Sequence, residues 1–439
     1  MTRGADYDVV VIGGGPAGLA AAIAARKAGA DRVLVIERNG EPGGILPQCI
    51  HNGFGAIVFG QDLPGPQYAL RYSRMAAAEG VQIMLDTFVV EISNERDVYA
   101  MSSNEGYVHF RPRAIVLAMG CRERTRAQIR LPGTRAAGVF TAGTVQRLVN
   151  IEGYMPGRRF AVLGSGDIGM IMARRLAIEG AEVVGVYELL PYLTGLRRNY
   201  VQCLSDYEIP LHLSMTVTNI FGKERVEGIE VSKVDERLQP IPGSEQVIAC
   251  DALLLSVGLI PENELSRQIG IEIDPRTSGP RVDSSMATSV PGIFAAGNVT
   301  GIYDLVDYVS KAGEVAGYEA AKFAAGVQTA RSLNATSVRP AEEAVSSGAV
   351  RVTPGENVGT IIPQLLKVAV GQAERYVTIR PRALIERRVR VSFLDGDREV
   401  YGFWETYARP AEMMVHKVDA RFSDAIGAAQ SRELEVVIR

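Results

Sequence analysis

Cysteine and histidine are scarce in this sequence, and their spacing excludes several kinds of chemistry. Only four residues of each type occur among 439. The histidines are far apart along the chain and predict no metal-ligand cluster, so we propose no metal. The cysteines contain no C-x-x-C pair and do not form the framework of a small secreted protein, so we expect free thiols. They are Cys49, Cys121, Cys203 and Cys250.

The sequence also lacks an excess of one charge and a long apolar run. Its formal net charge is -3 at pH 7, which gives no electrostatic reason to expect nucleic acid or an anionic membrane as a partner. The apolar stretch at 17–30 is too short to span a bilayer and contains Arg26 and Lys27, so we expect a buried helix and no membrane insertion. The first residues lack the order of a signal peptide, which favours a cytoplasmic location.

The strongest positive signal is a glycine motif close to the start of the chain. A β-branched apolar run at 7–12 leads into G-x-G-x-x-G at 13–18. The first glycine permits a tight turn, the second lets the backbone approach a pyrophosphate, and the third lets the following helix pack closely. A second apolar run at 32–36 ends in Glu37, 19 positions after the last glycine. Strand, glycines, helix and acid in this register predict a dinucleotide site with Glu37 on a ribose.

The same unit occurs a second time. A strand pattern at 159–163 leads into G-x-G-x-x-G at 164–169, and a second strand at 183–187 leads to Glu188, again 19 positions after the last glycine. Two copies imply two dinucleotides. A glutamate at this position repels a 2′-phosphate, and no arginine follows it until residue 197. We therefore expect the second site to prefer NAD(H) over NADP(H).

With these motifs, the chain resembles the two-dinucleotide-binding-domain flavoproteins, which include thioredoxin reductase, glutathione reductase and NADH oxidases. The resemblance covers about residues 6–325, and further matching segments lie at 114–120, 252–263 and 288–298. It implies FAD and NAD(H) as cofactors. The FAD contacts that it implies are Gly13, Gly15, Pro16, Ala17, Gly18, Glu37, Arg38, Gly44, Val89, Ala118, Gly120, Gly297 and Asn298. The NAD contacts are Gly164, Gly166, Asp167, Ile168, Gly169, Glu188 and Gly258.

Asn298 departs from the family pattern, in which an aspartate at this position holds the ribityl chain of FAD. An amide can still hydrogen-bond a hydroxyl, but it lacks the charge that makes the stronger bond. Alternatively, Asn298 is the N-cap of a helix. We expect FAD to bind, less tightly than in relatives that carry the aspartate.

A redox disulfide is missing from both places where this group of flavoproteins carries one. Leu46 and His51 stand where the disulfide reductases have a C-x-x-x-x-C pair, and the second unit has no C-x-x-C. Cys49 and His51 remain as tentative catalytic residues that the resemblance places near the isoalloxazine. Cys49 is either a low-pKa thiol assisted by His51, as in NADH oxidases and peroxidases, or a small packed side chain beside a hydrogen-bonding histidine. We favour the second interpretation.

A longer string at 43–55, with segments at 121–125 and 138–144, narrows the resemblance. It is similar to the NAD/FAD subunits of multi-component dehydrogenases for glycerol 3-phosphate, sarcosine, opines and dye-linked proline oxidation, and to hydrogen cyanide synthase. This implies hydride transfer between NAD(H) and FAD, an oligomer, a partner flavoprotein dehydrogenase and an iron-sulfur subunit. The alternative is a stand-alone NADH oxidase or peroxidase that uses Cys49.

The family resemblance also predicts the domain organisation. We expect an α/β fold with two Rossmann-like three-layer domains and a small C-terminal β-rich domain. The FAD domain is expected to be discontinuous, at 1–121 and 286–330, around an NAD domain at 122–285. Residues 331–439 are expected to form a linker and the β-rich domain.

The C-terminal segment shows patterns of its own. Ala, Ser and Thr dominate 324–348, which indicates a linker. Period-two runs at 388–393 and 400–404 flank a turn at 395–397 and predict a hairpin. Trp404, the only tryptophan, either anchors a protein interface together with nearby arginines or lies in the core.

Overall fold

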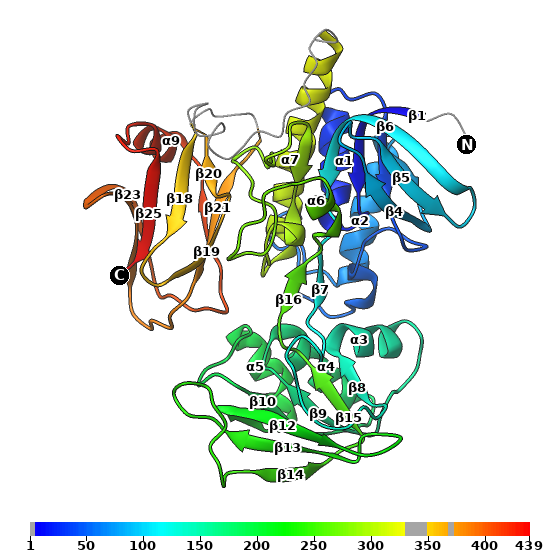
Figure 1. Cartoon of the computed structure of the whole chain (residues 1–439), viewed down its shortest axis with the longest axis vertical. Coiled ribbons are helices and arrows are strands. Elements are labelled where there is room, and N and C mark those ends of the chain that lie inside the picture. Colours follow the sequence, from blue (N-terminus) through cyan, green and yellow to red (C-terminus); the bar gives the residue numbers. More distant parts are fainter. Residues whose placement is uncertain (1–4, 330–348, 368–372) are drawn as a thin grey trace. The chain divides into compact units, whose positions relative to one another are not determined.

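The computed structural model describes residues 5–329, 349–367 and 373–439 (Figure 1). These residues form two compact units. One contains Met1–Cys121 together with Pro261–Arg439, and Arg122–Ile260 form the other. The second unit is therefore inserted into the sequence of the first. Each is described by itself.

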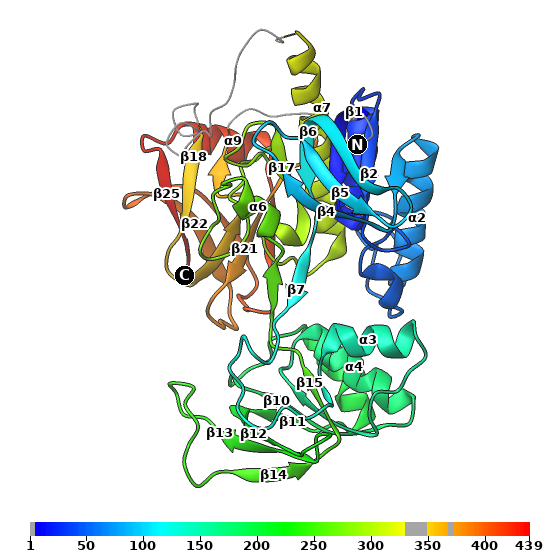
Figure 2. The same ribbon diagram turned by 45° about the vertical axis from the view of Figure 1, so that its right-hand side comes forward.

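The first unit contains a seven-stranded sheet in the order β3-β2-β1-β6-β5-β4, with β17 also paired to β6. Strands β1, β2, β3, β6 and β17 pair in parallel, whereas β4, β5 and β6 form an antiparallel meander (Figure 2). The central strands are apolar because they are covered on both faces, and Val9, Val10 and Val11 are fully buried. The strands are β1 (Ala5–Ile12), β2 (Val33–Ile36), β3 (Gln82–Met84), β4 (Thr87–Ile92), β5 (Val98–Ser102), β6 (Gly106–Leu117) and β17 (Ile293–Ala295).

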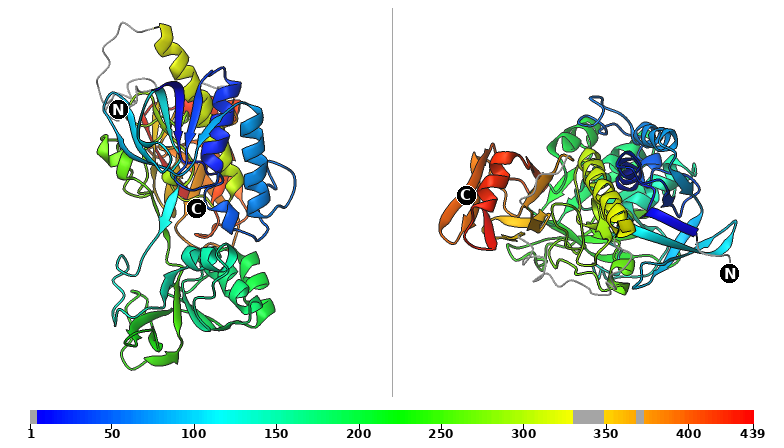
Figure 3. Two further views of the ribbon diagram at one scale, coloured as in Figure 1. Left: turned by 90° about the vertical axis from the view of Figure 1, so that its right-hand side faces the viewer. Right: turned by 90° about the horizontal axis from the view of Figure 1, so that it is seen from above.

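Two long helices, α1 and α7, pack against each other beside this sheet, and both views of Figure 3 show yellow-green α7 next to blue α1. Glycines allow their close approach, since a Cβ at Gly313 or Gly317 would lie 2.2 or 1.9 Å from a backbone oxygen of α1. The helix α7 runs through Thr329, so the predicted linker at 324–348 begins too early, and its remainder lies outside the described residues. The helices are α1 (Pro16–Lys27), η1 (Leu46–Gln48), α2 (Gly65–Ala78), α6 (Glu264–Gln268), η3 (Gly297–Val299) and α7 (Val306–Thr329).

The boundary after the inserted unit differs from the prediction. The sequence placed it at residue 285, and the structure places it at residue 260. Residues 261–285 belong to the first unit because Ile269, Ile271 and Val282 are buried in its hydrophobic core.

The second unit contains a five-stranded parallel sheet in the order β11-β10-β9-β15-β8 and a three-stranded antiparallel sheet, β12-β13-β14. Two short strands at the crossovers, β7 and β16, pair as a ribbon. The strands are β7 (Cys121–Glu123), β8 (Val139–Thr141), β9 (Arg159–Leu163), β10 (Glu182–Glu188), β11 (Leu211–Leu213), β12 (Met215–Phe221), β13 (Gly228–Lys233), β14 (Gln246–Ala249), β15 (Ala252–Leu255) and β16 (Leu259–Pro261). The helices are α3 (Ala142–Asn150), α4 (Asp167–Ile178), α5 (Arg197–Cys203) and η2 (Ser205–Tyr207).

The C-terminal segment is rich in β-strands and has its own hydrophobic cluster. Its sheets have the orders β20-β18-β25-β22-β23 and β19-β21-β24. The predicted hairpin is present, with Asp395 paired to Arg398. Trp404 is 52% exposed, so it does not lie in the core. The elements are β18 (Val350–Pro354), β19 (Val358–Ile362), β20 (Leu365–Leu366), β21 (Tyr376–Pro381), β22 (Val389–Asp395), β23 (Arg398–Glu405), β24 (Met414–Lys417), α9 (Ala420–Gly427) and β25 (Glu433–Ile438).

Two features are absent from the described residues. Within the described ranges, no helix combines the length and apolar character needed to cross a bilayer. Among the same residues, no group of three or more His, Cys, Asp or Glu side chains could hold a metal ion.

We expect Gly317→Ala to destabilise the first unit, because its Cβ would lie 1.9 Å from the backbone oxygen of Ala21 and force α1 and α7 apart. The expected loss in unfolding free energy is about 1–3 kcal/mol, measured by urea denaturation. Gly326 is a matched control on the same helix, where a Cβ meets nothing within 4 Å. Gly326→Ala should leave stability unchanged or raise it slightly. Equal stability of the two variants would contradict this account of the helix packing.

Candidate functional site

The first glycine turn follows β1 and depends on the absence of side chains. Gly13 donates its N–H to the backbone oxygen of Ile36 at 2.8 Å and has a φ of +106°. A Cβ there would lie 2.4 Å from the oxygen of Ala118, and a Cβ at Gly18 would lie 1.8 Å from the oxygen of Gly13. The turn therefore brings the ends of β1, β2 and β6 together and packs α1 directly behind them.

Glu37, at the end of β2, anchors this turn. Its side chain is buried, with 4% exposed. Oε2 accepts the N–H of Gly14 at 2.7 Å, and Oε1 accepts the N–H of Asn39 at 2.8 Å. Because a carboxylate oxygen accepts about two hydrogen bonds, each oxygen keeps one acceptor position, which suits a pair of ribose hydroxyls.

Most of the other residues predicted to contact FAD lie beside this turn. The rest lie next to a residue that borders the turn. The Gly43 N–H donates to Gly14 at 2.8 Å, which brings Gly44 against Gly15. The Thr87 N–H donates to the backbone oxygen of Glu37 at 3.0 Å, so the strand that carries Val89 begins next to the acid. A Cβ at Gly297 would lie 2.8 Å from the Cβ of Ala17. Arg38 is exposed.

Asn298 uses its amide locally. Its Oδ1 accepts the N–H of Tyr303 at 3.1 Å, and its Nδ2 lies 3.6 Å from the Cys121 sulfur, which brings it close to Gly120. The residue lies within η3, whose N-cap is Ala296, and α7 begins only at Val306. Asn298 is therefore not a helix N-cap, and the amide is held in place by its neighbours.

The second unit repeats the same construction after β9. Gly164 donates its N–H to the oxygen of Tyr187 at 2.7 Å, as Gly13 does to its own neighbouring strand. Glu188 is again 4% exposed, and it accepts the N–H groups of Ser165 and Leu190 at 2.8 and 2.9 Å. The carboxyl ends of β9, β10 and β15 meet at one edge, because the Gly169 N–H donates to Ser256 at 3.1 Å.

The other predicted NAD contacts lie on both sides of this turn. Asp167 is the first residue of α4 and precedes the partly buried Ile168. Its Oδ1 accepts the Leu196 N–H at 2.8 Å and the side-chain amide of Asn199 at 2.6 Å, so it also fixes the segment that follows β10. Gly258 follows β15 with a φ of +100° and accepts an N–H from Arg124 at 2.9 Å.

In each unit the glycine turn, the N-terminus of the following helix and the buried glutamate together form what we call a cradle. The N-termini of α1 and α4 are chemically suited to a phosphate group. Both helices are fully described, and the N-cap residue of each is a glycine, Gly15 or Gly166, with no side-chain cap; in α4 the N–H of Gly169 already has Ser256 as its acceptor. The first N–H groups of a helix have no partner within the helix and carry the positive end of its dipole. Glycine backbone, uncapped helix and buried acid together fit one dinucleotide in each unit.

Cys49 and His51 lie on one short loop in different environments. Cys49 is 7% exposed, and its thiol donates to the backbone oxygen of Ile45 at 3.4 Å. Burial raises the pKa of this thiol to about 12, which is opposite to the low-pKa thiol of the oxidase interpretation. His51 is partly exposed, with Nδ1 2.8 Å from the oxygen of Asn52 and its ring 5.1 Å from that of Phe54.

Asp307 is a structural residue of this region that the sequence analysis missed. It is 1% exposed and lies in the first turn of α7. Its two oxygens accept the N–H groups of Val58 at 2.8 Å and Gly55 at 3.2 Å, which ties the loop after Cys49 to this helix. An acid in the first turn of a helix is a weak signal by itself, and its partners lie about 250 residues earlier in the chain.

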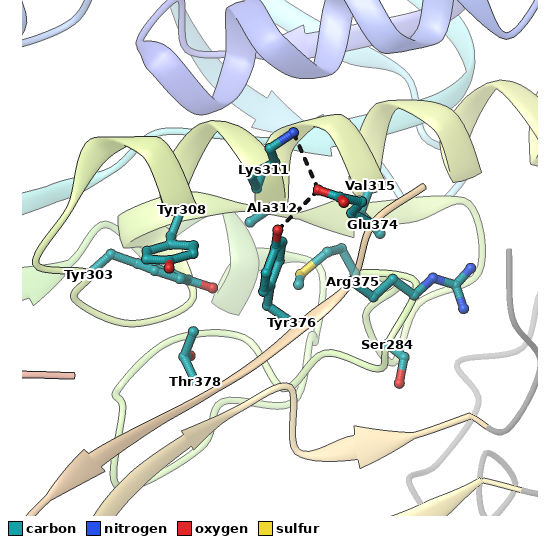
Figure 4. Close-up of a pocket in the computed structure, with 11 residues that line it drawn as sticks. Ser284, Tyr303, Tyr308, Lys311, Ala312, Val315, Glu374, Arg375, Tyr376 and Thr378 are labelled. Carbon is teal, nitrogen blue, oxygen red and sulfur yellow. Dashed lines mark hydrogen bonds and ion pairs between the residues drawn. The ribbon is translucent and has the colours of Figure 1, made fainter. Parts of the chain in front are cut away.

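A small pocket lies between α7 and β21 and is not lined by residues of the glycine turns (Figure 4). Tyr303, Tyr308 and Tyr376 line it, and Glu374 accepts the Tyr376 hydroxyl at 3.0 Å. Lys311 lies 3.8 Å from the same carboxylate. The pocket contains none of the predicted site residues, and its charged groups are already paired.

We expect Asp307→Ala to leave two N–H groups of the loop at 53–59 without an acceptor. The unfolding free energy should fall by about 2–4 kcal/mol, and limited proteolysis should cut the loop faster. Asp307→Asn keeps one carbonyl acceptor and should lose less. A loss in Asp307→Ala that stays well below this range would show that other contacts hold the loop.

Comparison with known proteins agrees with this construction. The family model described as pyridine nucleotide-disulphide oxidoreductase matches residues 7–313. One of the subunits of opine oxidase from Agrobacterium tumefaciens (strain Ach5) is 28% identical over 67% of this chain and 62% of its own length. The HcnB subunit of hydrogen cyanide synthase from Pseudomonas aeruginosa is 28% identical over 67% of this chain and 66% of its length. The chain thus spans less than two thirds of these relatives.

A solved structure shows the same fold. Thioredoxin reductase of T. acidophilum aligns with a TM-score of 0.58 and 23% identity, over 72% of this chain and 98% of that one. The family match covers both glycine turns and both buried glutamates. The chain therefore belongs to the pyridine nucleotide-disulphide oxidoreductase family, whose members use FAD and NAD(P)H.

Proposed function

We propose that this chain transfers hydride between NAD(H) and FAD as the electron-transfer subunit of a multi-component dehydrogenase, such as one for glycerol 3-phosphate. The observation that carries the proposal is the repeated cradle. One chain builds a glycine turn, an uncapped helix and a buried glutamate twice, with Glu37 in one unit and Glu188 in the other. Two such sites in one family member suit two dinucleotides that react with each other.

The chain itself orients the two groups. FAD, when bound, would supply the redox chemistry of the hydride transfer. Glu37 and Glu188 offer acceptors to ribose hydroxyls, and the first turns of α1 and α4 offer N–H groups to the pyrophosphates. Holding two reactants in position accounts for most of the rate advantage in such a reaction.

A partner is part of the proposal. The names of the two relatives describe them as subunits, which supports an assembly of this chain with other subunits. The assembly we propose is oligomeric and cytoplasmic, with a partner flavoprotein dehydrogenase and an iron-sulfur subunit. Trp404 supports a protein contact, because it is exposed on the edge strand β23 with the guanidinium groups of Arg388 and Arg390 over its ring. Tryptophan and arginine often anchor interfaces.

We also propose a preference for NADH over NADPH. The buried carboxylate of Glu188 would repel a 2′-phosphate. The arginines that follow it, Arg197 and Arg198, are exposed on α5. The alternative function, a stand-alone oxidase or peroxidase that uses Cys49, is not favoured, because burial of that thiol raises its pKa to about 12.

The test is anaerobic stopped-flow mixing of the FAD-loaded protein with NADH or NADPH, followed by oxygen. NADH should bleach the flavin rapidly and NADPH slowly, because only NADPH carries a 2′-phosphate that would lie against Glu188. Slow reoxidation by oxygen would support a subunit that passes its electrons to a partner. Fast reoxidation would indicate an oxidase, and the absence of bleaching would reject hydride transfer.

We expect Cys49→Ser to change the rates of flavin bleaching and reoxidation by less than about twofold, because a thiol with a pKa near 12 stays protonated at neutral pH. The same stopped-flow experiment measures both rates. Cys203→Ser is a matched control, since Cys203 is also buried but lies in the second unit. A loss of oxygen or peroxide turnover in Cys49→Ser alone would restore the oxidase alternative.

A further inference from the structure

The two buried glutamates differ in how many hydrogen bonds the protein already donates to them. Glu37 accepts two, one on each oxygen. Glu188 accepts four. Its Oε1 accepts the Leu190 N–H, whereas its Oε2 accepts the N–H of Ser165 at 2.8 Å, the hydroxyl of Ser165 at 2.7 Å and the hydroxyl of Thr194 at 2.9 Å. Oε2 therefore carries three donors, one more than a carboxylate oxygen usually accepts, and the Thr194 hydroxyl is the most distant of them.

The extra donors come from residues that also hold each other. Ser165 is fully buried, and its oxygen accepts the N–H of Thr194 at 3.0 Å. The two hydroxyl oxygens lie 3.1 Å apart. The segment after β10 thus folds back over the glycine turn and brings a threonine hydroxyl to the carboxylate. The first unit has Gly14 in place of Ser165, so its glutamate receives no such hydroxyl.

A ribose presents two hydroxyl donors, and the two cradles receive them differently. At Glu37, each oxygen keeps one position, so the diol can bind without displacing any protein group. At Glu188, only Oε1 keeps a position, so the second ribose hydroxyl must replace a donor that is already present. A backbone N–H is fixed by the turn, whereas a hydroxyl can rotate away.

We propose that the hydroxyl of Thr194 competes with the ribose of NAD(H) for Oε2 of Glu188, and that NAD(H) displaces it on binding. This rests on the proposed function, which assigns NAD(H) to the second unit. Burying a carboxylate costs free energy that hydrogen bonds offset, and the Thr194 hydroxyl adds a fourth bond to Glu188 when the nucleotide has left. The same bond weakens nucleotide binding. The second unit therefore favours release and exchange of NAD(H), whereas the first favours retention of FAD.

The test measures binding, without turnover. NAD⁺ is titrated calorimetrically into the oxidised, FAD-loaded protein, with which it does not react. Thr194→Val removes the competing hydroxyl at nearly constant volume, so the Kd for NAD⁺ should fall by about threefold to tenfold, the effect of one hydrogen bond. Thr194→Ser keeps the hydroxyl and should retain the wild-type Kd. Thr194→Ala should bind more tightly than wild type, as Thr194→Val does.

The chain offers a matched control in the same unit. The hydroxyl of Thr218 donates to Glu230 at 2.7 Å on the antiparallel sheet, so Thr218→Val removes an equivalent bond away from the glycine turn and should leave the Kd unchanged. If wild type binds NAD⁺ and Thr194→Val and Thr194→Ala show an unchanged or higher Kd, the inference is wrong and the proposed function stands. If wild type binds no NAD⁺, the proposed function fails and the inference fails with it.

Discussion

A hydrogen bond from a glycine-turn amide to a buried glutamate fixes the turn in each nucleotide-binding unit. In both units the acid ends the second strand and receives an N–H from the turn that follows the first. Without that acceptor, the turn would leave an amide unsatisfied in a buried place. The bond therefore fixes the distance between two strand ends, and with it the place where a ribose and a pyrophosphate can lie together.

The sequence was sufficient to predict the two glycine turns and the acid beside each, because their determinants are local. Strand, turn, helix and strand follow each other within about 30 residues, and the acid stands 19 positions after the last glycine in both copies. The interactions that set the boundary between the two units are not local in sequence. Residues 261–285 contain one helix of five residues, α6, and join the first unit through Ile269 and Val282, whose burial depends on distant strands.

The environments of single side chains were harder still to predict. For Cys49 the sequence left two interpretations and favoured a packed side chain; the burial itself comes from packing that involves α2 and η1, and a Cβ at Gly65 would lie 2.9 Å from the Cβ of Cys49. Asp307 meets a loop from the other end of the first unit's sequence. The hydroxyl of Thr194 reaches Glu188 only because the chain after β10 folds back. Each of these three environments depends on a contact between different segments of the chain, and the pattern of apolar residues along the chain does not indicate such contacts.

The interrupted first unit also imposes an order on biosynthesis. Its strand β17 pairs with β6, and its helix α7 packs on α1, although residues 122–260 are translated between these partners. As the chain leaves the ribosome, the inserted unit can complete its own sheet first. Until Gly313 and Gly317 emerge, the apolar side of α1 that they cover stays open to solvent. A nascent chain stalled before α7 would thus have a folded second unit and an incompletely folded first unit, and it would be a substrate for chaperones.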